Sequence, residues 1–153
     1  MHGQARRSRS QGGAAAVEFA FVFPVLFLLI YGVIVYSYIF VLQESINYAA
    51  QQAAEAAVAV EPGTAGYDAL ATARARAMAS RVLNWLPQSQ QTRVLGETGD
   101  KVEVTFGNAG DSDVVQVRLR FSLPGLFPVL DLPIVGEVPR LPPQLIAQAV
   151  ARV

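Results

Sequence analysis

Glu18 is the residue of this chain whose type and position most clearly suggest chemistry. It is the last charged residue before an uncharged, mostly apolar run of 24 residues, Phe19–Leu42. A carboxylate drawn into hydrocarbon costs roughly 2.5–3.5 kcal/mol on insertion scales, so such a group generally has a partner of opposite charge. The residue therefore indicates ion pairing at a membrane boundary. The alternative is that Glu18 only marks the headgroup boundary at the start of a helix.

The other polar residues offer no combination typical of an enzyme. The only histidine is His2 and there is no cysteine, so the usual nucleophile–base pairs and the metal sites built on His and Cys have no candidates beyond the N-terminus. Asn108, Asp111 and Asp113 could offer oxygen ligands to calcium, but the later bidentate Glu of a calcium loop is missing. Since Asn and Asp are ordinary turn residues, the sequence predicts no enzyme, no cofactor and no metal site.

The apolar run is long enough to cross a bilayer as a helix, which needs about 20 residues. A buried core helix is rarely apolar on every face over such a length, and Pro24 lies near the first turns, where membrane helices accept proline. Three arginines precede the run, namely Arg6, Arg7 and Arg9. By the positive-inside rule they stay in the cytoplasm. We therefore expect a single-pass membrane protein whose C-terminal part is extracytoplasmic.

A cleaved secretory signal is the first alternative to an anchor. Its apolar region would span 7–15 residues and would be followed by small residues. Here the run is longer, and the small residues Gly12–Ala16 come before it. Cleavage after the run is therefore not expected.

The segment from Gly13 through Glu18 to Phe19, followed by an uninterrupted apolar helix, resembles the processing site of type IV prepilins. It is most similar to the Flp subclass and, within it, to the TadE-like pseudopilins of tight-adherence systems. The likeness is closest over residues 6–60 and is looser, in the order of elements, to the C-terminus. The resemblance implies cleavage between Gly13 and Ala14 by a prepilin peptidase.

The same resemblance gives Glu18 a role. After cleavage Ala14 would carry a free ammonium group, and Glu18, four residues further, would lie on the same face of the helix. An acid in the first turn also complements the positive helix N-terminus. In pilins the proposed partner of this carboxylate is the amine of the same chain or of a neighbouring subunit, and the pair aligns a subunit for assembly.

The resemblance implies a minor pilin or pseudopilin that is anchored in the bacterial inner membrane, with its head on the periplasmic side. Such a protein assembles or primes a Flp-type pilus, either in the filament or at its base. It would therefore serve adhesion or secretion. The implied partners are the lipid bilayer, the prepilin peptidase, the major Flp-type pilin, sister pseudopilins and the inner-membrane pilus platform. The rival interpretations are an uncleaved, signal-anchored structural subunit of another envelope complex and a membrane-tethered enzyme or binding module. Residues 14–153 carry nine basic groups against twelve acids, so no nucleic-acid partner is expected.

Three regions are expected: a basic leader at 1–13, a transmembrane and stalk helix at 14–61, and an α+β head at 62–153. In the stalk, Ala49, Ala53 and Ala57 are four residues apart, which allows close helix approach. Their partner is either a neighbouring subunit or a second helix, expected over 67–86. The apolar stripe expected on that second helix consists of Ala71, Ala75, Met78, Val82 and Trp85.

The head should contain a small antiparallel sheet of about three strands. Apolar residues alternate over 102–106 and 115–123, which predicts a hairpin whose loop is 107–113. A polar linker is expected over 88–93, a short strand at Val94–Leu95 and a final strand at 145–153, where a helix fits almost as well. Residues 124–143, here called the proline-rich segment, hold six prolines among apolar residues. They argue against a helix or a central strand and should cover the chain's own core, the membrane surface or a partner.

Overall fold

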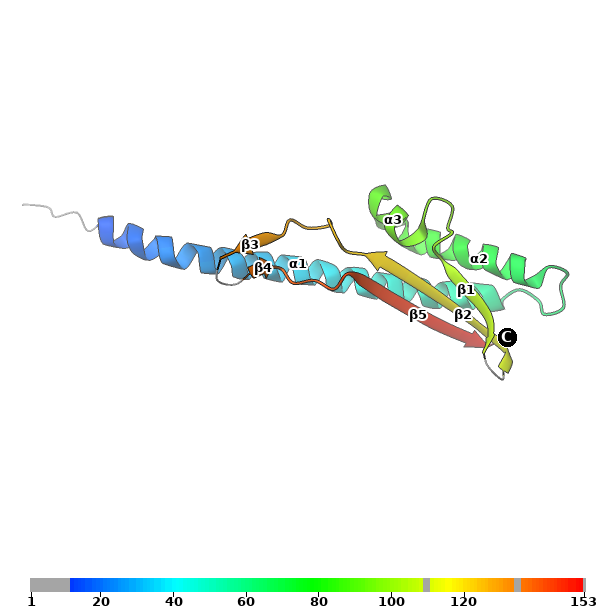
Figure 1. Ribbon diagram of the computed structural model, residues 1–153. Helices are drawn as coiled ribbons and strands as arrows, with labels where there is room; N and C mark the ends of the chain where they lie inside the picture. Colours follow the sequence, from blue (N-terminus) through cyan, green and yellow to red (C-terminus); the bar gives the residue numbers. More distant parts are fainter. Residues whose placement is uncertain (1–11, 109–110, 134–135, 153) are drawn as a thin grey trace, which may run out of the picture.

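The protein has the predicted α+β architecture, in which one long helix carries two shorter helices and a small antiparallel sheet along its C-terminal half (Figure 1). The structure, a computed structural model, describes residues 12–108, 111–133 and 136–152. Helix α1, Gly12–Val58, has 47 residues, about 70 Å at 1.5 Å per residue. It continues through Pro24 without a break, and it begins two residues before the expected start at residue 14.

Helix α2, Tyr67–Val82, returns antiparallel along α1 (Figure 1). The two helices meet through buried alanines spaced four residues apart, which are Ala49, Ala53 and Ala57 on α1 and Ala71, Ala75 and Ala79 on α2. Small side chains on both helices let the backbones approach closely. The partner of the alanine stripe on α1 is therefore the chain's own second helix.

The apolar stripe predicted for the second helix is partly wrong. Its first two alanines are buried, but Met78 and Val82 are only half-buried and Trp85 is 52% exposed. Leu83 and Leu86 are buried instead. The reason is that the buried positions keep a spacing of four, from Ala71 to Leu83, the first residue of the 3₁₀ turn η1, Leu83–Trp85. Trp85, two residues after Leu83, therefore lies on the opposite, exposed side.

The polar linker and the short strand expected next are also wrong, because these residues form helix α3, Gln88–Leu95. Pro87 precedes it with φ −55°, and its carbonyl accepts hydrogen bonds from the amides of Gln90 and Gln91. Proline suits a helix start because its fixed φ is already helical. Val94 and Leu95 are buried as the apolar end of this helix rather than as the start of a strand.

The predicted hairpin is confirmed. Strands β1, Glu103–Asn108, and β2, Asp111–Ser122, pair antiparallel and extend into the expected loop. The C-terminal segment forms strand β5, Gln144–Arg152, as favoured from the sequence, and pairs antiparallel with β2 to give the order β1-β2-β5.

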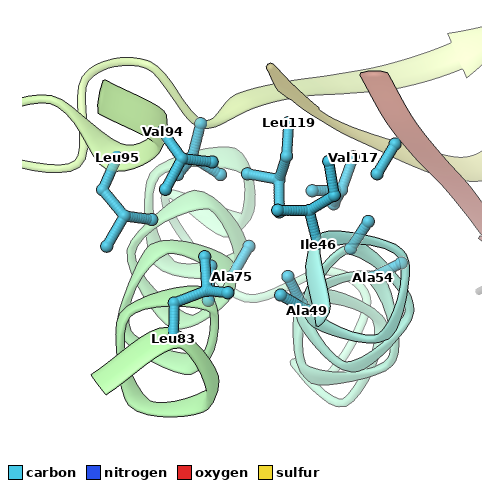
Figure 2. Close-up of a cluster of buried hydrophobic side chains, with 14 of the residues drawn as sticks. Ile46, Ala49, Ala54, Ala75, Leu83, Val94, Leu95, Val117 and Leu119 are labelled. Atoms are coloured by element: carbon cyan, nitrogen blue, oxygen red, sulfur yellow. The ribbon is translucent and has the colours of Figure 1, made fainter. Parts of the chain in front are cut away.

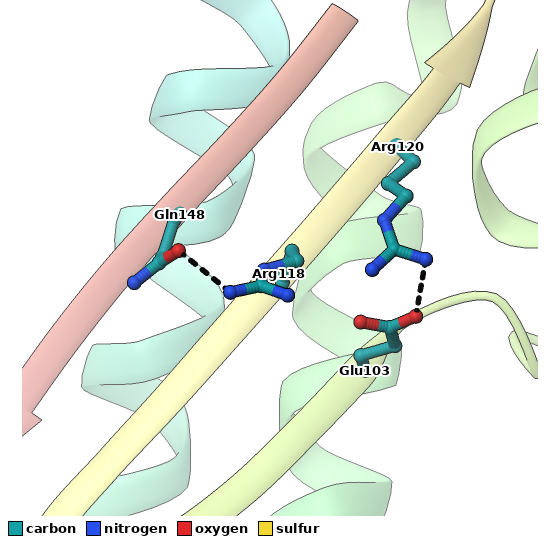
Figure 3. Close-up of polar contacts among 4 residues, drawn as sticks. All are labelled: Glu103, Arg118, Arg120 and Gln148. Carbon is teal, nitrogen blue, oxygen red and sulfur yellow. Dashed lines mark hydrogen bonds and ion pairs between the residues drawn. The ribbon is translucent and has the colours of Figure 1, made fainter. Parts of the chain in front are cut away.

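One face of this sheet packs on the helices and the other is polar. Buried side chains of β2, including Val117 and Leu119, meet Ile46 of α1 and Leu83 beside α2 in a single core (Figure 2). On the other face Arg120 pairs with Glu103 at 2.8 Å and Arg118 donates to Gln148 at 3.1 Å (Figure 3). The arginines of β2 thus lie on a solvated face.

The proline-rich segment contains a second, two-stranded sheet that was not predicted. Strand β3, Leu130–Leu132, pairs antiparallel with β4, Gly136–Val138. This hairpin lies beside the middle of α1, closer to the N-terminus of the helix than any other strand (Figure 1).

Candidate functional site

The N-terminal half of α1 is a bare apolar surface. Gly13–Val58 is the one helix among the described residues that is long and apolar enough to cross a membrane, and only 11% of its most apolar window is buried. Phe21 is 75% exposed and Val25 67%. The core helix of a soluble protein would be mostly buried, whereas a helix that is apolar and exposed on all sides suits hydrocarbon.

Four aromatic rings form a continuous ridge on this surface. Phe19, Phe23, Phe27 and Tyr31 are spaced four residues apart, and successive ring centroids lie 5.3, 6.2 and 6.2 Å from each other. Residues at this spacing lie on one face of a helix. This ridge was not predicted, although the regular spacing of the four aromatic residues is visible in the sequence.

Glu18 lies beside the first ring of the ridge, and its side chain is exposed. Because α1 begins at Gly12, Glu18 lies in the second turn of the helix in the full chain. The expectation of an acid in the first turn concerns the cleaved chain and stays a prediction. No described residue forms a hydrogen bond or an ion pair with its carboxylate. The leader arginines Arg6, Arg7 and Arg9 lie outside the described residues.

Gly13 and Ala14 belong to the first turns of α1 and are both exposed. A Cβ atom added at Gly13 would meet no atom of another described residue within 4 Å. The fold of this chain therefore gives no packing reason for glycine at position 13.

The second half of the apolar run is covered on one face by the proline-rich segment. The hydroxyl of Tyr31 donates to the carbonyl of Pro128, and the hydroxyl of Tyr36 donates to the carbonyl of Arg140 at 3.4 Å. The ring of Tyr38 packs edge-on against Phe127 with centroids 5.6 Å apart. The sequence left open whether this segment covers its own chain, the membrane surface or a partner. In the structure it covers an apolar part of its own chain.

The proline-rich segment also lines an open cavity of about 580 Å³. Its walls are mainly prolines and apolar side chains, with Glu137 and Arg140 as the charged members. Among the described residues no group of three or more His, Cys, Asp or Glu side chains could hold a metal ion. The lining of the cavity suits contact with apolar groups.

Comparison with known proteins finds a match for helix α1. Residues 13–55, nearly the whole of α1, match the family model described as TadE-like protein. No curated protein and no solved structure matches the chain. The match covers the helix and not the head, and it begins at Gly13. The likeness predicted from the sequence is thus confirmed over residues 13–55, which are similar to the TadE-like family of Tad pili.

Proposed function

We propose that this protein is a membrane-anchored minor pilin or pseudopilin that acts in assembly or priming of a Flp-type pilus. The observation that carries the proposal is Glu18, an exposed carboxylate without a partner among the described residues, at the head of an exposed apolar helix that matches the TadE-like family. An unpaired charge at the edge of hydrocarbon is costly. Its neutralisation by another subunit would make association favourable.

The proposal includes processing by a prepilin peptidase between Gly13 and Ala14. No described residue would contact a side chain at position 13, so Gly13 stands on an open surface that a peptidase could reach. After the cut the ammonium group of Ala14 lies one helical turn from Glu18 and can pair with it or with Glu18 of a sister subunit. The leader would remain in the cytoplasm and the head would stand on the periplasmic side of the inner membrane.

The processing step is tested by mass spectrometry of the protein extracted from membranes. We expect a mature chain that starts at Ala14, and accumulation of the full-length chain in the variant Gly13→Leu. Gly32→Leu is the matched control, because Gly32 also lies in α1 with no neighbour within 4 Å. An intact Met1 in the natural chain, or cleavage beyond Leu42, would contradict the proposal.

One observation favours the alternative of an uncleaved, signal-anchored structural subunit. The bond between Gly13 and Ala14 lies inside α1, in helical conformation, and a protease needs the bond that it cuts to be unwound. The same mass measurement separates the two functions. Besides the bilayer and the peptidase, the proposed partners of the cleaved pilin are the major Flp-type pilin, sister pseudopilins and the pilus platform.

A further inference from the structure

The proline-rich segment is attached to the part of α1 that the sequence alone would place inside the membrane. Tyr31 lies near the middle of the uncharged run Phe19–Leu42, and its hydroxyl bonds the carbonyl of Pro128. The β3–β4 hairpin, which follows Pro128, lies along the same stretch of helix (Figure 1). A bilayer that covered the whole run would therefore have to contain the hairpin as well.

The hairpin is not compatible with hydrocarbon. Its two strands pair only with each other, so their outer edges carry backbone N–H and C=O groups outside the ladder, and lipid-exposed open sheet edges do not occur within the hydrocarbon region. Asp131 and Glu137 are opposite each other in the ladder, and both are exposed. Each carboxylate would add a cost of its own in hydrocarbon.

The same segment is nevertheless too apolar for a surface that faces only water. Val129 is 54% exposed, and Leu130 and Leu132 are half-exposed. Val129 also lines the open 580 Å³ cavity, whose walls are mainly prolines and apolar side chains beside Glu137 and Arg140. Apolar side chains mixed with carboxylates and tyrosines are typical of the boundary between headgroups and acyl chains.

We propose that the proline-rich segment rests in the interfacial layer of the extracytoplasmic leaflet and is in contact with lipid. The partner of this surface is the bilayer itself, since the surface continues that of the membrane-spanning helix at Tyr31. This inference rests on the proposed function only in requiring that α1 spans a membrane.

The contact fixes the depth at which α1 sits. If the hydrocarbon ends near Tyr31, a span of about 20 residues reaches back to Gly12, not to Phe19. Glu18 then lies about 9 Å, or six residues of 1.5 Å, inside the cytoplasmic edge of the hydrocarbon. The predicted cleavage site lies at the membrane surface, and residues 32–42 lie outside the hydrocarbon although they carry no charge.

The chain has no cysteine, so single cysteines can report depth in the full-length protein in liposomes, through their reaction with a membrane-impermeant maleimide applied from the head side. The decisive position is Ser37, which is exposed on α1. It lies inside the membrane if the whole run Phe19–Leu42 is buried, and outside it if the hydrocarbon ends near Tyr31. Val150→Cys on β5 is the head control, and Phe23→Cys is the membrane control.

We expect Ser37→Cys to react within about threefold of the rate of Val150→Cys, and Phe23→Cys to react at least about tenfold more slowly, because a thiol in hydrocarbon is neither ionised nor reached by the reagent. Slow reaction at both Ser37 and Phe23 would overturn the proposed depth and leave the anchor intact. Fast reaction at Phe23 would instead refute membrane insertion, and with it the proposed function.

Lipid contact is measured with a single tryptophan. In the Trp85→Phe background, Val129→Trp should be quenched several-fold more strongly by lipids brominated near the headgroup than Val150→Trp. Equal quenching of the two would overturn the proposal. So would cross-linking of Val129→Cys to a second copy at low protein-to-lipid ratio, because that result assigns the surface to a subunit contact.

Discussion

Glu18 combines a charge with a neighbourhood that is otherwise apolar and open. Its chain neighbours Val17 and Phe19 are 58% and 65% exposed, and no described residue pairs with the carboxylate. Within one subunit, the group that can neutralise it on the same helical face is the amine that cleavage before Ala14 would create. Its energetic contribution therefore arises only after processing or in an assembly.

Replacement of Glu18 by Gln removes the charge and keeps the shape of the side chain. We expect unchanged or easier membrane insertion and at least tenfold fewer assembled pili, because a hydrogen bond to a charged group contributes about 1.5–3 kcal/mol. The measurement is the amount of sheared pilin, together with the membrane fraction of this protein. Glu44→Gln, on an exposed site of the same helix, is the control. Normal piliation in Glu18→Gln would remove this carboxylate from the mechanism.

Tyr31→Phe tests whether the hydrogen bond of the Tyr31 hydroxyl holds the proline-rich segment on α1. Loss of the hydroxyl that bonds the Pro128 carbonyl should weaken docking of the segment by about 0.5–1.5 kcal/mol. Hydrogen exchange of the amides in β3 should rise accordingly, by up to about tenfold. Tyr48→Phe is the control, since Tyr48 is 56% exposed and no described residue bonds its hydroxyl. Equal exchange in the two variants would show that this bond does not hold the segment.

At the scale of elements, the contact between α1 and α2 depends on small side chains. Ala75 is fully buried, whereas Ala73 on the same helix is exposed. Ala75→Leu should cost about 1–3 kcal/mol by overpacking, and Ala73→Leu should leave stability nearly unchanged. Thermal unfolding of the purified full chain in detergent measures the difference. Equal midpoints would show that the helices are not closely packed at this level.

The elements that could be predicted from the sequence are those with one solvent-exposed face and one buried face. β2 alternates apolar residues with arginines, so its period of two is visible. α3 could not be found in this way, because its only buried residues, Val94 and Leu95, lie together at its end and resemble the start of a strand. The exposure of Trp85 could not be predicted, because the sequence does not show that the buried residues keep a spacing of four from Ala71 to Leu83, which leaves residue 85 on the exposed side.

The candidate site also has one part that could be predicted from the sequence and one part that could not. Gly13, Glu18 and the apolar run are contiguous in sequence, so their relation could be derived directly. The contact between Tyr31 and the proline-rich segment could not be derived, because Pro128 is 97 residues away. A proline-rich loop also has no regular spacing of apolar residues that would indicate which surface it packs on. The composition of residues 124–143 predicted that they cover an apolar surface, but not which one.

At the scale of the whole molecule, the helix and the head share one core. Leu42, Ile46 and Ala50 of α1 are fully buried against α2 and the sheet. A fragment of residues 62–153 would lose this side of its core. We expect it to be unfolded by circular dichroism and by NMR dispersion, whereas a fragment of residues 38–153, which keeps the core part of α1, should fold. A folded 62–153 fragment would show that the head is independent of the helix.

The unbroken course of α1 also has a mechanical consequence. One continuous helix runs from Gly12 to Val58, and no hinge separates its bare half from the half to which the sheet is fastened. A rotation of the anchor therefore also turns β2 and β5, which pack on the C-terminal half of α1. If the anchor enters an array of helices as proposed, the angle of entry decides which edge strand of the sheet, β1 or β5, faces the next subunit.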